Sequence, residues 1–155
     1  MQKRKQGFTL TEIMVVVVII GILASIAVPL FNKFRESSQG TRFANDLRTF
    51  RDGVELFAME TVNLPANPAT GTVPPILQGY FPEQRFTSPT PLGGRWDIEI
   101  NASGVTLAVG AHFQGDNVPS NERLEVVDSI LDDGDIETGL LRMITNDRFY
   151  WVVYE

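Results

Sequence analysis

Apolar and polar residues form successive patterns along this chain. From Ile13 to Phe31, nineteen residues, only Ser25 carries a polar side chain. A run of that length can cross the core of a bilayer as a helix. Further on, apolar residues recur at spacings of four, three, four and three, which predicts a helix with one apolar face. These residues are Phe43, Leu47, Phe50, Val54 and Phe57. We therefore expect one helix from about Phe8 to Met59, on the order of 78 Å long at 1.5 Å per residue.

The pattern after residue 94 is typical of strands with one intervening helix. Apolar and polar residues alternate over 95–100, and 105–109 follows a short turn, which predicts a hairpin. Residues 140–145 and 149–154 predict a second hairpin. Between the hairpins, apolar spacings of three and four predict a helix over about 120–131, with Ser120 or Asn121 as its cap. We expect an α+β fold, a roll in which a four-stranded antiparallel sheet packs on the second half of the long helix.

The intervening segment, residues 63–94, is rich in proline and glycine and predicts a long connecting loop with short helical turns around 76–79. It ends in Gly93-Gly94-Arg95-Trp96. A phosphate-binding loop is not expected there, because no Lys-Ser/Thr pair follows the glycines and a strand comes next. Trp96 is expected to be a core residue or a lid over the sheet.

Composition and charge exclude several classes of function. The formal net charge is -6, and three of the 13 basic residues are Lys3, Arg4 and Lys5 at the start of the chain. The remaining acidic body is poorly suited to binding nucleic acid, whose phosphates need clustered Lys and Arg. The absence of cysteine excludes disulfides, thiolate metal sites and cysteine nucleophiles.

The basic residues before the apolar run allow three interpretations. The first is a secretory signal peptide, but the small-x-small site near Ala24–Ala27 lies inside the apolar run, which continues beyond it. The second is a plain membrane anchor whose basic end stays in the cytoplasm. The third comes from the stretch Gly7-Phe8-Thr9-Leu10-Thr11-Glu12. It resembles the cleavage motif of type IV pilins and type II secretion pseudopilins.

The resemblance implies roles for individual residues. The chain would be cut after Gly7, and the new amine of Phe8 would be methylated. Glu12 of one subunit would pair with the Phe8 amine of a neighbour and set the axial register, since a carboxylate buried in an apolar bundle is costly unless paired. Before assembly, Glu12 would reach the headgroups of the membrane. Gly21 and Pro29 fall where such helices often carry these residues, and the stretch between them is expected to melt on assembly.

The same resemblance implies a domain plan and partners. We expect a leader at 1–7, a membrane and filament-core helix at 8–34, its amphipathic continuation at 35–61 and a globular domain at 62–155. The chain would cross the inner membrane once, N-terminus in the cytoplasm, and then enter a periplasmic or surface filament. Its partners would be other filament subunits, a prepilin peptidase that also methylates, a membrane platform protein and an assembly ATPase.

Two questions of function stay open. The compact body, the absence of cysteine and an acidic loop favour a pseudopilin slightly over a pilin. A different class is a monomeric membrane-anchored binding protein that uses residues 63–94 as its ligand surface.

The acidic loop follows the predicted helix near residue 131. Hard oxygen ligands around a glycine turn suit Ca²⁺, although the spacing does not match an EF-hand. The alternative is a solvated turn. The resemblance to pseudopilins supports calcium, because some major pseudopilins bind it in this region. The candidate ligands are Asp132, Asp133, Asp135 and Glu137.

Catalysis is not expected. His112 is the single histidine and has no evident Ser-His-Asp partners in the sequence. Asp97 and Glu99 share one face of a predicted strand, which we expect to be exposed to solvent.

Overall fold

The computed structural model describes residues 7–61 and 63–155, and the chain divides into two compact units. The division falls between Ser37 and Ser38. The three basic residues of the predicted leader, at positions 3–5, lie outside the described residues. Each unit is described below by itself.

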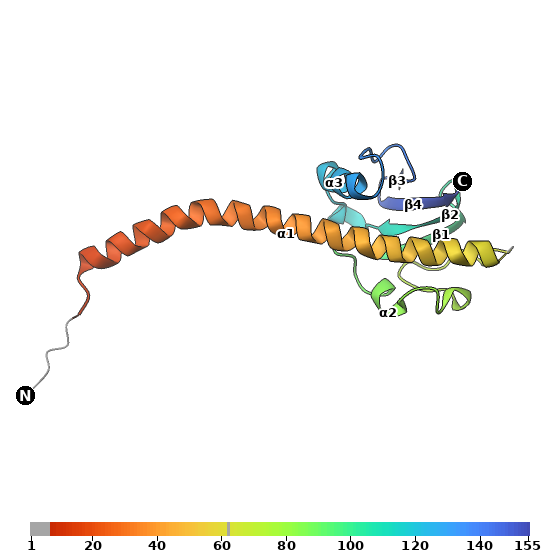
Figure 1. Ribbon diagram of the computed structural model, residues 1–155, viewed down its shortest axis with the longest axis horizontal. Helices are drawn as coiled ribbons and strands as arrows, with labels where there is room; N and C mark the ends of the chain where they lie inside the picture. Colours follow the sequence, from red (N-terminus) through yellow and green to blue (C-terminus); the bar gives the residue numbers. More distant parts are fainter. Residues whose placement is uncertain (1–6, 62) are drawn as a thin grey trace, which may run out of the picture. The chain divides into compact units, whose positions relative to one another are not determined.

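The long predicted helix is confirmed as α1, which runs from Leu10 to Glu60 (Figure 1). It continues through Pro29, although proline removes one backbone donor. Ser25 Oγ donates a hydrogen bond of 2.7 Å to the carbonyl oxygen of Ile22, one turn earlier. The segment from Gly21 to Pro29 is thus helical in the single chain, and its melting on assembly stays a prediction.

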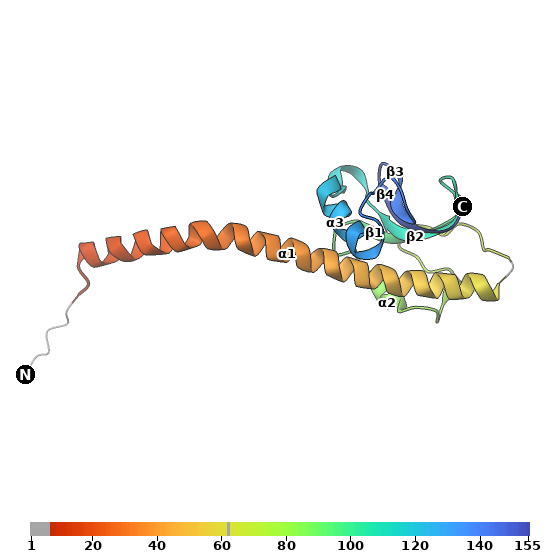
Figure 2. The same cartoon turned by 45° about the horizontal axis from the view of Figure 1, so that its top comes forward.

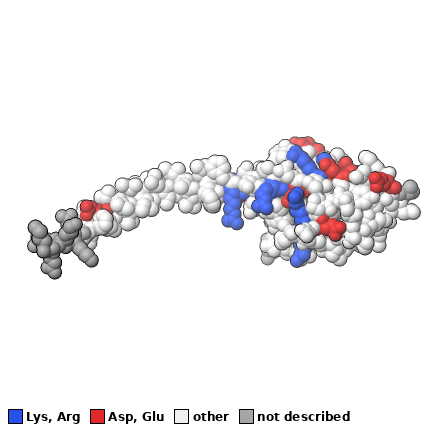
Figure 3. Space-filling model, turned by 60° about the horizontal axis from the view of Figure 1, so that its bottom comes forward, with Lys and Arg blue, Asp and Glu red and all other residues white. Residues whose placement is uncertain are grey.

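The described part of the first unit has no buried side chain. Its residues from 7 to 37 are all exposed, including the whole apolar run over 13–31. Within the described residues, α1 is the one helix that is long and apolar enough to cross a membrane. Figure 3 shows this apolar run as a continuous white surface without charged side chains. A contiguous apolar surface of this size marks a site of contact with lipid or other proteins.

The second unit contains the predicted four-stranded antiparallel sheet, with strand order β1-β2-β4-β3 (Figure 1). The first hairpin joins β1 (Arg95–Ala102) to β2 (Val105–His112), and the second joins β3 (Leu141–Thr145) to β4 (Arg148–Tyr154). Both hairpins are confirmed. β1 and β2 extend past their predicted ends, because Ala102 still pairs with Val105 and His112 with Arg95.

The core of this unit lies between the sheet and the second half of α1. The predicted apolar stripe is confirmed, and each of its members is at most 1% exposed. Trp96 of β1 stacks on Phe43 at 4.8 Å between ring centroids and meets Phe50 edge-on at 4.8 Å. Such aromatic pairs add about 1 kcal/mol each beyond the burial of their area. Trp96 is therefore a core residue and not a lid.

The segment between α1 and β1 also contributes to the core. It forms η1 (Pro75–Leu77) and α2 (Glu83–Phe86), on the other side of α1 from the sheet (Figures 1 and 2). Phe81 and Phe86 meet Phe50 edge-on at 5.5 and 5.1 Å. The predicted helical turn near residue 76 is confirmed, whereas α2 was not predicted.

The remaining regular elements are η2 (Gly115–Asn117) and the predicted helix, α3 (Asn121–Leu131). Ser120 occupies the N-cap position, although its side chain makes no capping hydrogen bond. Leu124 and Val127 point into the core and are fully buried. The helix thus positions the acidic loop that follows it.

Candidate functional site

The start of α1 is closed by a reciprocal hydrogen-bonding arrangement between Thr9 and Glu12. The backbone N–H and the hydroxyl of Thr9 donate to Glu12 Oε2 at 2.7 and 2.8 Å. In return, the backbone N–H of Glu12 donates to Thr9 Oγ1 at 3.3 Å. This is a capping box, which satisfies two backbone donors that a helix start otherwise leaves unpaired. Its Thr-x-x-Glu spacing was visible in the sequence, but our interpretation missed it.

The capping box leaves half of the carboxylate available. Both bonds from Thr9 end on Oε2 of Glu12, and Oε1 has no hydrogen-bond partner among the described residues. Glu12 itself is exposed. Its carboxylate can therefore hold its own helix start and accept a further donor at the same time.

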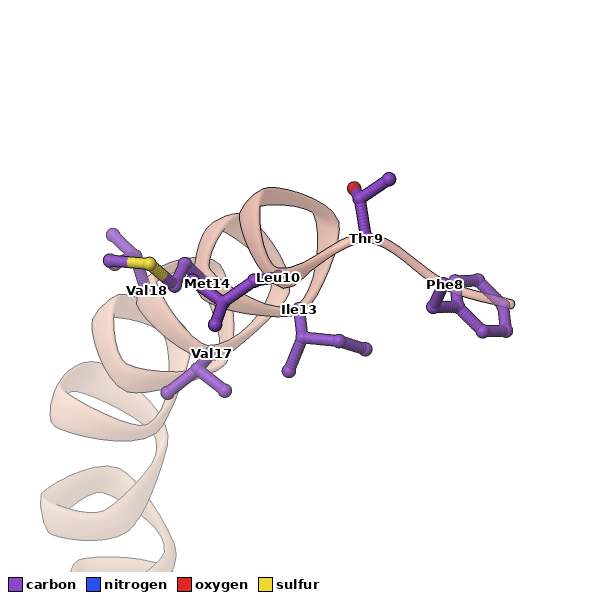
Figure 4. Close-up of a pocket in the computed structure, with 7 residues that line it drawn as sticks. All are labelled: Phe8, Thr9, Leu10, Ile13, Met14, Val17 and Val18. Carbon is purple, nitrogen blue, oxygen red and sulfur yellow. The ribbon is translucent and has the colours of Figure 1, made fainter. Parts of the chain in front are cut away.

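An open apolar hollow lies beside this carboxylate (Figure 4). Phe8 is 85% exposed and Ile13 is 51% exposed. These two residues occupy the positions before and after the cap at which apolar side chains often pack together. The lining consists of Phe8, Thr9, Leu10, Ile13, Met14, Val17 and Val18.

Gly7 has no structural reason to be glycine within the described chain. A Cβ built at Gly7 would meet nothing within 4 Å, and the residue is exposed. Packing within the described chain therefore does not require a glycine at this position.

The acidic loop brings together a carboxylate that the sequence analysis did not include. Ligand atoms of Asp128, Asp132 and Asp133 lie within 4.8 Å of one another. Asp135 and Glu137 are not in this group. Asp128 lies one helical turn before Asp132, and this spacing was the available signal. The group of carboxylates therefore lies closer to the end of α3 than the sequence analysis predicted.

These carboxylates also hold the loop in shape. Asp132 Oδ2 accepts from the backbone N–H groups of Leu140 and Leu141 at 2.5 and 3.0 Å. Asp128 Oδ2 accepts from the N–H of Gly134 at 2.5 Å. The other oxygen of Asp128, Oδ1, is buried without a hydrogen-bond partner among the described residues. Burial, together with the neighbouring carboxylates, raises the pKa of Asp128 to about 6.

A second polar cluster corrects our expectation for Asp97 and Glu99. They are 3% and 2% exposed, not solvent-facing. Residues 67–71, here called the strap, contact these carboxylates. Asn67 Nδ2 donates to Glu99 Oε2 at 3.0 Å, and the hydroxyl of Thr70 lies 3.2 Å from Asp97 Oδ2. Burial raises the pKa of Asp97.

His112 has partners that the sequence did not reveal. Its Nε2 lies 3.1 Å from Asp147 Oδ2, and its Nδ1 lies 3.1 Å from Thr70 Oγ1. Threonine, histidine and aspartate thus stand in a row, as in a nucleophilic triad. However, the one hydroxyl proton of Thr70 already faces two acceptors, the imidazole and Asp97. This geometry fastens the strap to the sheet.

Comparison with known proteins finds similarity at the start of the chain. The family described as "Prokaryotic N-terminal methylation motif" matches residues 2–28. Type II secretion system core protein G of Aeromonas hydrophila is 38% identical over 66 residues, which cover 42% of this chain and 46% of that protein. A fimbrial protein of Pseudomonas aeruginosa is 40% identical over 58 residues, 37% of this chain and 38% of that protein.

A longer alignment reaches into the globular part. Type II secretion system core protein G of Escherichia coli (strain K12) is 30% identical over 87 residues, 52% of this chain and 60% of that protein. The chain therefore spans less than two thirds of the length of each of these relatives. No solved structure matches the chain.

Proposed function

We propose that this chain is a pilin-like filament subunit matured by cleavage after Gly7 and methylation of the Phe8 amine. The match of residues 2–28 to the methylation-motif family and the similarity to a type II secretion protein G and a fimbrial protein support this proposal. The subunit polymerises through α1 into a type II secretion pseudopilus or a type IV pilus. The fold, an apolar N-terminal helix followed by a four-stranded antiparallel sheet, supports this proposal.

The observation that carries the proposal is the exposed apolar helix with one carboxylate near its start. Glu12 is the single acidic residue from Gly7 to Phe34. In lipid or in a bundle of helices, an unpaired carboxylate is costly. Cleavage after Gly7 creates a positive amine on Phe8, and Glu12 Oε1 of a neighbouring copy can accept from it. Apolar helices slide easily along one another, so this charge pair sets their register.

Localisation and partners follow from the same proposal. The uncut chain spans the inner membrane with its N-terminus in the cytoplasm, and its globular unit lies outside. A prepilin peptidase removes the leader and transfers the methyl group. A membrane platform protein and an assembly ATPase drive insertion of each subunit into the filament.

Mass spectrometry of the N-terminal peptide, with electron microscopy of the envelope fraction, tests the maturation and the polymer together. The expected peptide begins at methylated Phe8, and the expected images show filaments that contain this chain. A chain that still begins at Met1, with no polymer, contradicts the proposal. That result favours the alternative, a monomeric membrane-anchored protein that binds a ligand through residues 63–94.

We further propose that the acidic loop binds Ca²⁺ through Asp128, Asp132 and Asp133. The buried, unpaired Oδ1 of Asp128 supports the site, because a buried carboxylate oxygen without a hydrogen-bond partner is rare unless an ion satisfies it. Carboxylate oxygens are the ligands that Ca²⁺ prefers. Asp135 and Glu137, the other two candidates, would contribute only to the charge around the site. Bound calcium would neutralise the cluster and tie the loop to α3.

Asp128→Asn is expected to act in opposite directions with and without calcium. In EDTA the variant is more stable at pH 7, because it removes a buried charge. A raised carboxyl pKa means that the folded state holds its proton more tightly than the unfolded state. The contribution of Asp128 to the stability of the parent protein should therefore fall as the pH rises from about 4 to about 6. With calcium, the parent protein should gain several degrees in melting temperature and the variant little.

The control for this experiment is Glu137→Gln, which removes a carboxylate outside the group of three. It should keep the calcium-dependent gain in melting temperature. Equal melting temperatures of the parent protein in EDTA and in millimolar calcium would exclude the site.

A further inference from the structure

We propose that His112 is a proton-dependent latch, which fastens the strap over the free edge of β1 more tightly when its imidazole is protonated. The strap is bound to this edge by two hydrogen bonds. The N–H of Gly71 donates to the carbonyl oxygen of Trp96 at 2.9 Å, and the N–H of Ile100 donates to Asn67 Oδ1 at 2.8 Å.

With Asp97 ionised, the hydrogen bonds around Thr70 can all form at once only when His112 is protonated. A hydroxyl has one proton to donate. With neutral His112 donating from Nε2 to Asp147, Nδ1 is an acceptor, and the Thr70 proton can reach either Nδ1 or Asp97 but not both. In the other neutral tautomer, the lone pair of Nε2 faces the carboxylate of Asp147. Each neutral tautomer of His112 therefore leaves at least one of these hydrogen bonds unformed.

When His112 is protonated, all of these hydrogen bonds can form together. Nε2–H donates to Asp147, Nδ1–H donates to Thr70 Oγ1, and the Thr70 hydroxyl then donates to Asp97. Protonation of His112 therefore adds one hydrogen bond to the contacts that hold the strap.

Charged groups of both signs surround the imidazole. Asp97 Oδ2 lies 3.9 Å from Nδ1, and the third carboxylate, Glu99, is engaged by Arg148 Nε at 2.7 Å. Arg95 and Arg148 pair with His112 across the ladder, so two guanidinium groups oppose three carboxylates. Tyr150, whose hydroxyl donates to Asp97 at 2.7 Å, stays neutral. The groups that face His112 are Arg95, Asp97, Glu99, Asp147, Arg148 and Tyr150.

The latch controls access to the edge of β1. An edge strand with unpaired N–H and C=O groups is a template for pairing with another chain. The strap satisfies the carbonyl oxygen of Trp96 and the N–H of Ile100 on this edge. When the strap opens, these groups become available to a further strand. Proton loss from His112 therefore makes the edge easier to expose.

Amide hydrogen exchange of the full chain in detergent micelles tests the latch. The N–H of Gly71 reports the opening of the strap, and its protection factor is corrected for the pH dependence of intrinsic exchange. Between pH 8 and pH 5.5, protection should rise roughly fivefold, the equivalent of one hydrogen bond. Exchange at the N–H of Gly93, which donates to the carbonyl oxygen of Thr90, is the internal control.

Two variants separate the latch from general stability. Thr70→Val removes the hydroxyl and should abolish the pH dependence at Gly71, whereas Thr70→Ser should keep it. His112→Gln should give low protection at every pH. Protection that is constant or falls toward pH 5.5 in the parent protein would overturn the proposal. A pH dependence that survives in the folded Thr70→Val protein would do the same.

Discussion

Glu12→Leu should abolish filament formation while the chain still enters the membrane and its second unit folds. The substitution makes the helix more apolar, which favours insertion. It also removes the carboxylate that we propose pairs with the Phe8 amine, and removing one partner of a buried charge pair is strongly destabilising because the other charge is left unpaired. Since each subunit of a polymer repeats this loss, filaments should be absent from electron micrographs of the envelope fraction.

Three further variants locate the cause of that defect. Ser25→Leu also replaces a polar side chain with leucine in the same helix, but it removes no charge and should leave assembly intact. Thr9→Val removes the hydroxyl of the capping box at a local cost of about 1 kcal/mol but keeps the carboxylate, so filaments should form in reduced amounts. Glu12→Gln keeps the hydrogen bond to the N–H of Thr9 without the charge. Filaments in normal amounts from Glu12→Leu would contradict the proposed pairing of Glu12 with the Phe8 amine as a requirement for assembly.

Much of the fold could be predicted because each element carries its own periodicity. The stripe from Phe43 to Phe57 shows the buried face of α1 directly, and alternation predicts both hairpins. α2 could not be predicted in this way. It has four residues, fewer than the window over which a helical period can be recognised.

Burial of polar residues was the main failure, and it has a physical cause. Alternation in β1 places Asp97 and Glu99 on one face, but it does not reveal what covers that face. The cover comes from Asn67 and Thr70, about thirty residues earlier in a loop without periodicity. The burial of Asp128, by contrast, could have been predicted from the sequence. Its spacing from Leu124 places it on the inner face of α3.

The polar cluster depends on the small size of Gly110 in the middle of the sheet. Asp97, Gly110 and Tyr150 are neighbours in one row across β1, β2 and β4. Because Gly110 has no side chain, Tyr150 can extend across β2 and donate to Asp97 at 2.7 Å. A Cβ at Gly110 would lie 2.2 Å from the carbonyl oxygen of Phe149 and 2.5 Å from Tyr150 Cα.

Gly110→Ala should therefore destabilise the second unit by about 3 kcal/mol or more, since neighbouring backbone must move to admit the methyl group. The expected fall in melting temperature is roughly 10 °C, measured by circular dichroism of the full chain in detergent. Gly40→Ala is the matched control, because its Cβ would only touch Val127 Cγ2 at 3.4 Å and alanine favours a helix. It should leave the melting temperature unchanged or raise it slightly. If the melting temperature of Gly110→Ala equals that of Gly40→Ala, the β2–β4 ladder is looser than described. Tyr150 would then not need this glycine to reach Asp97.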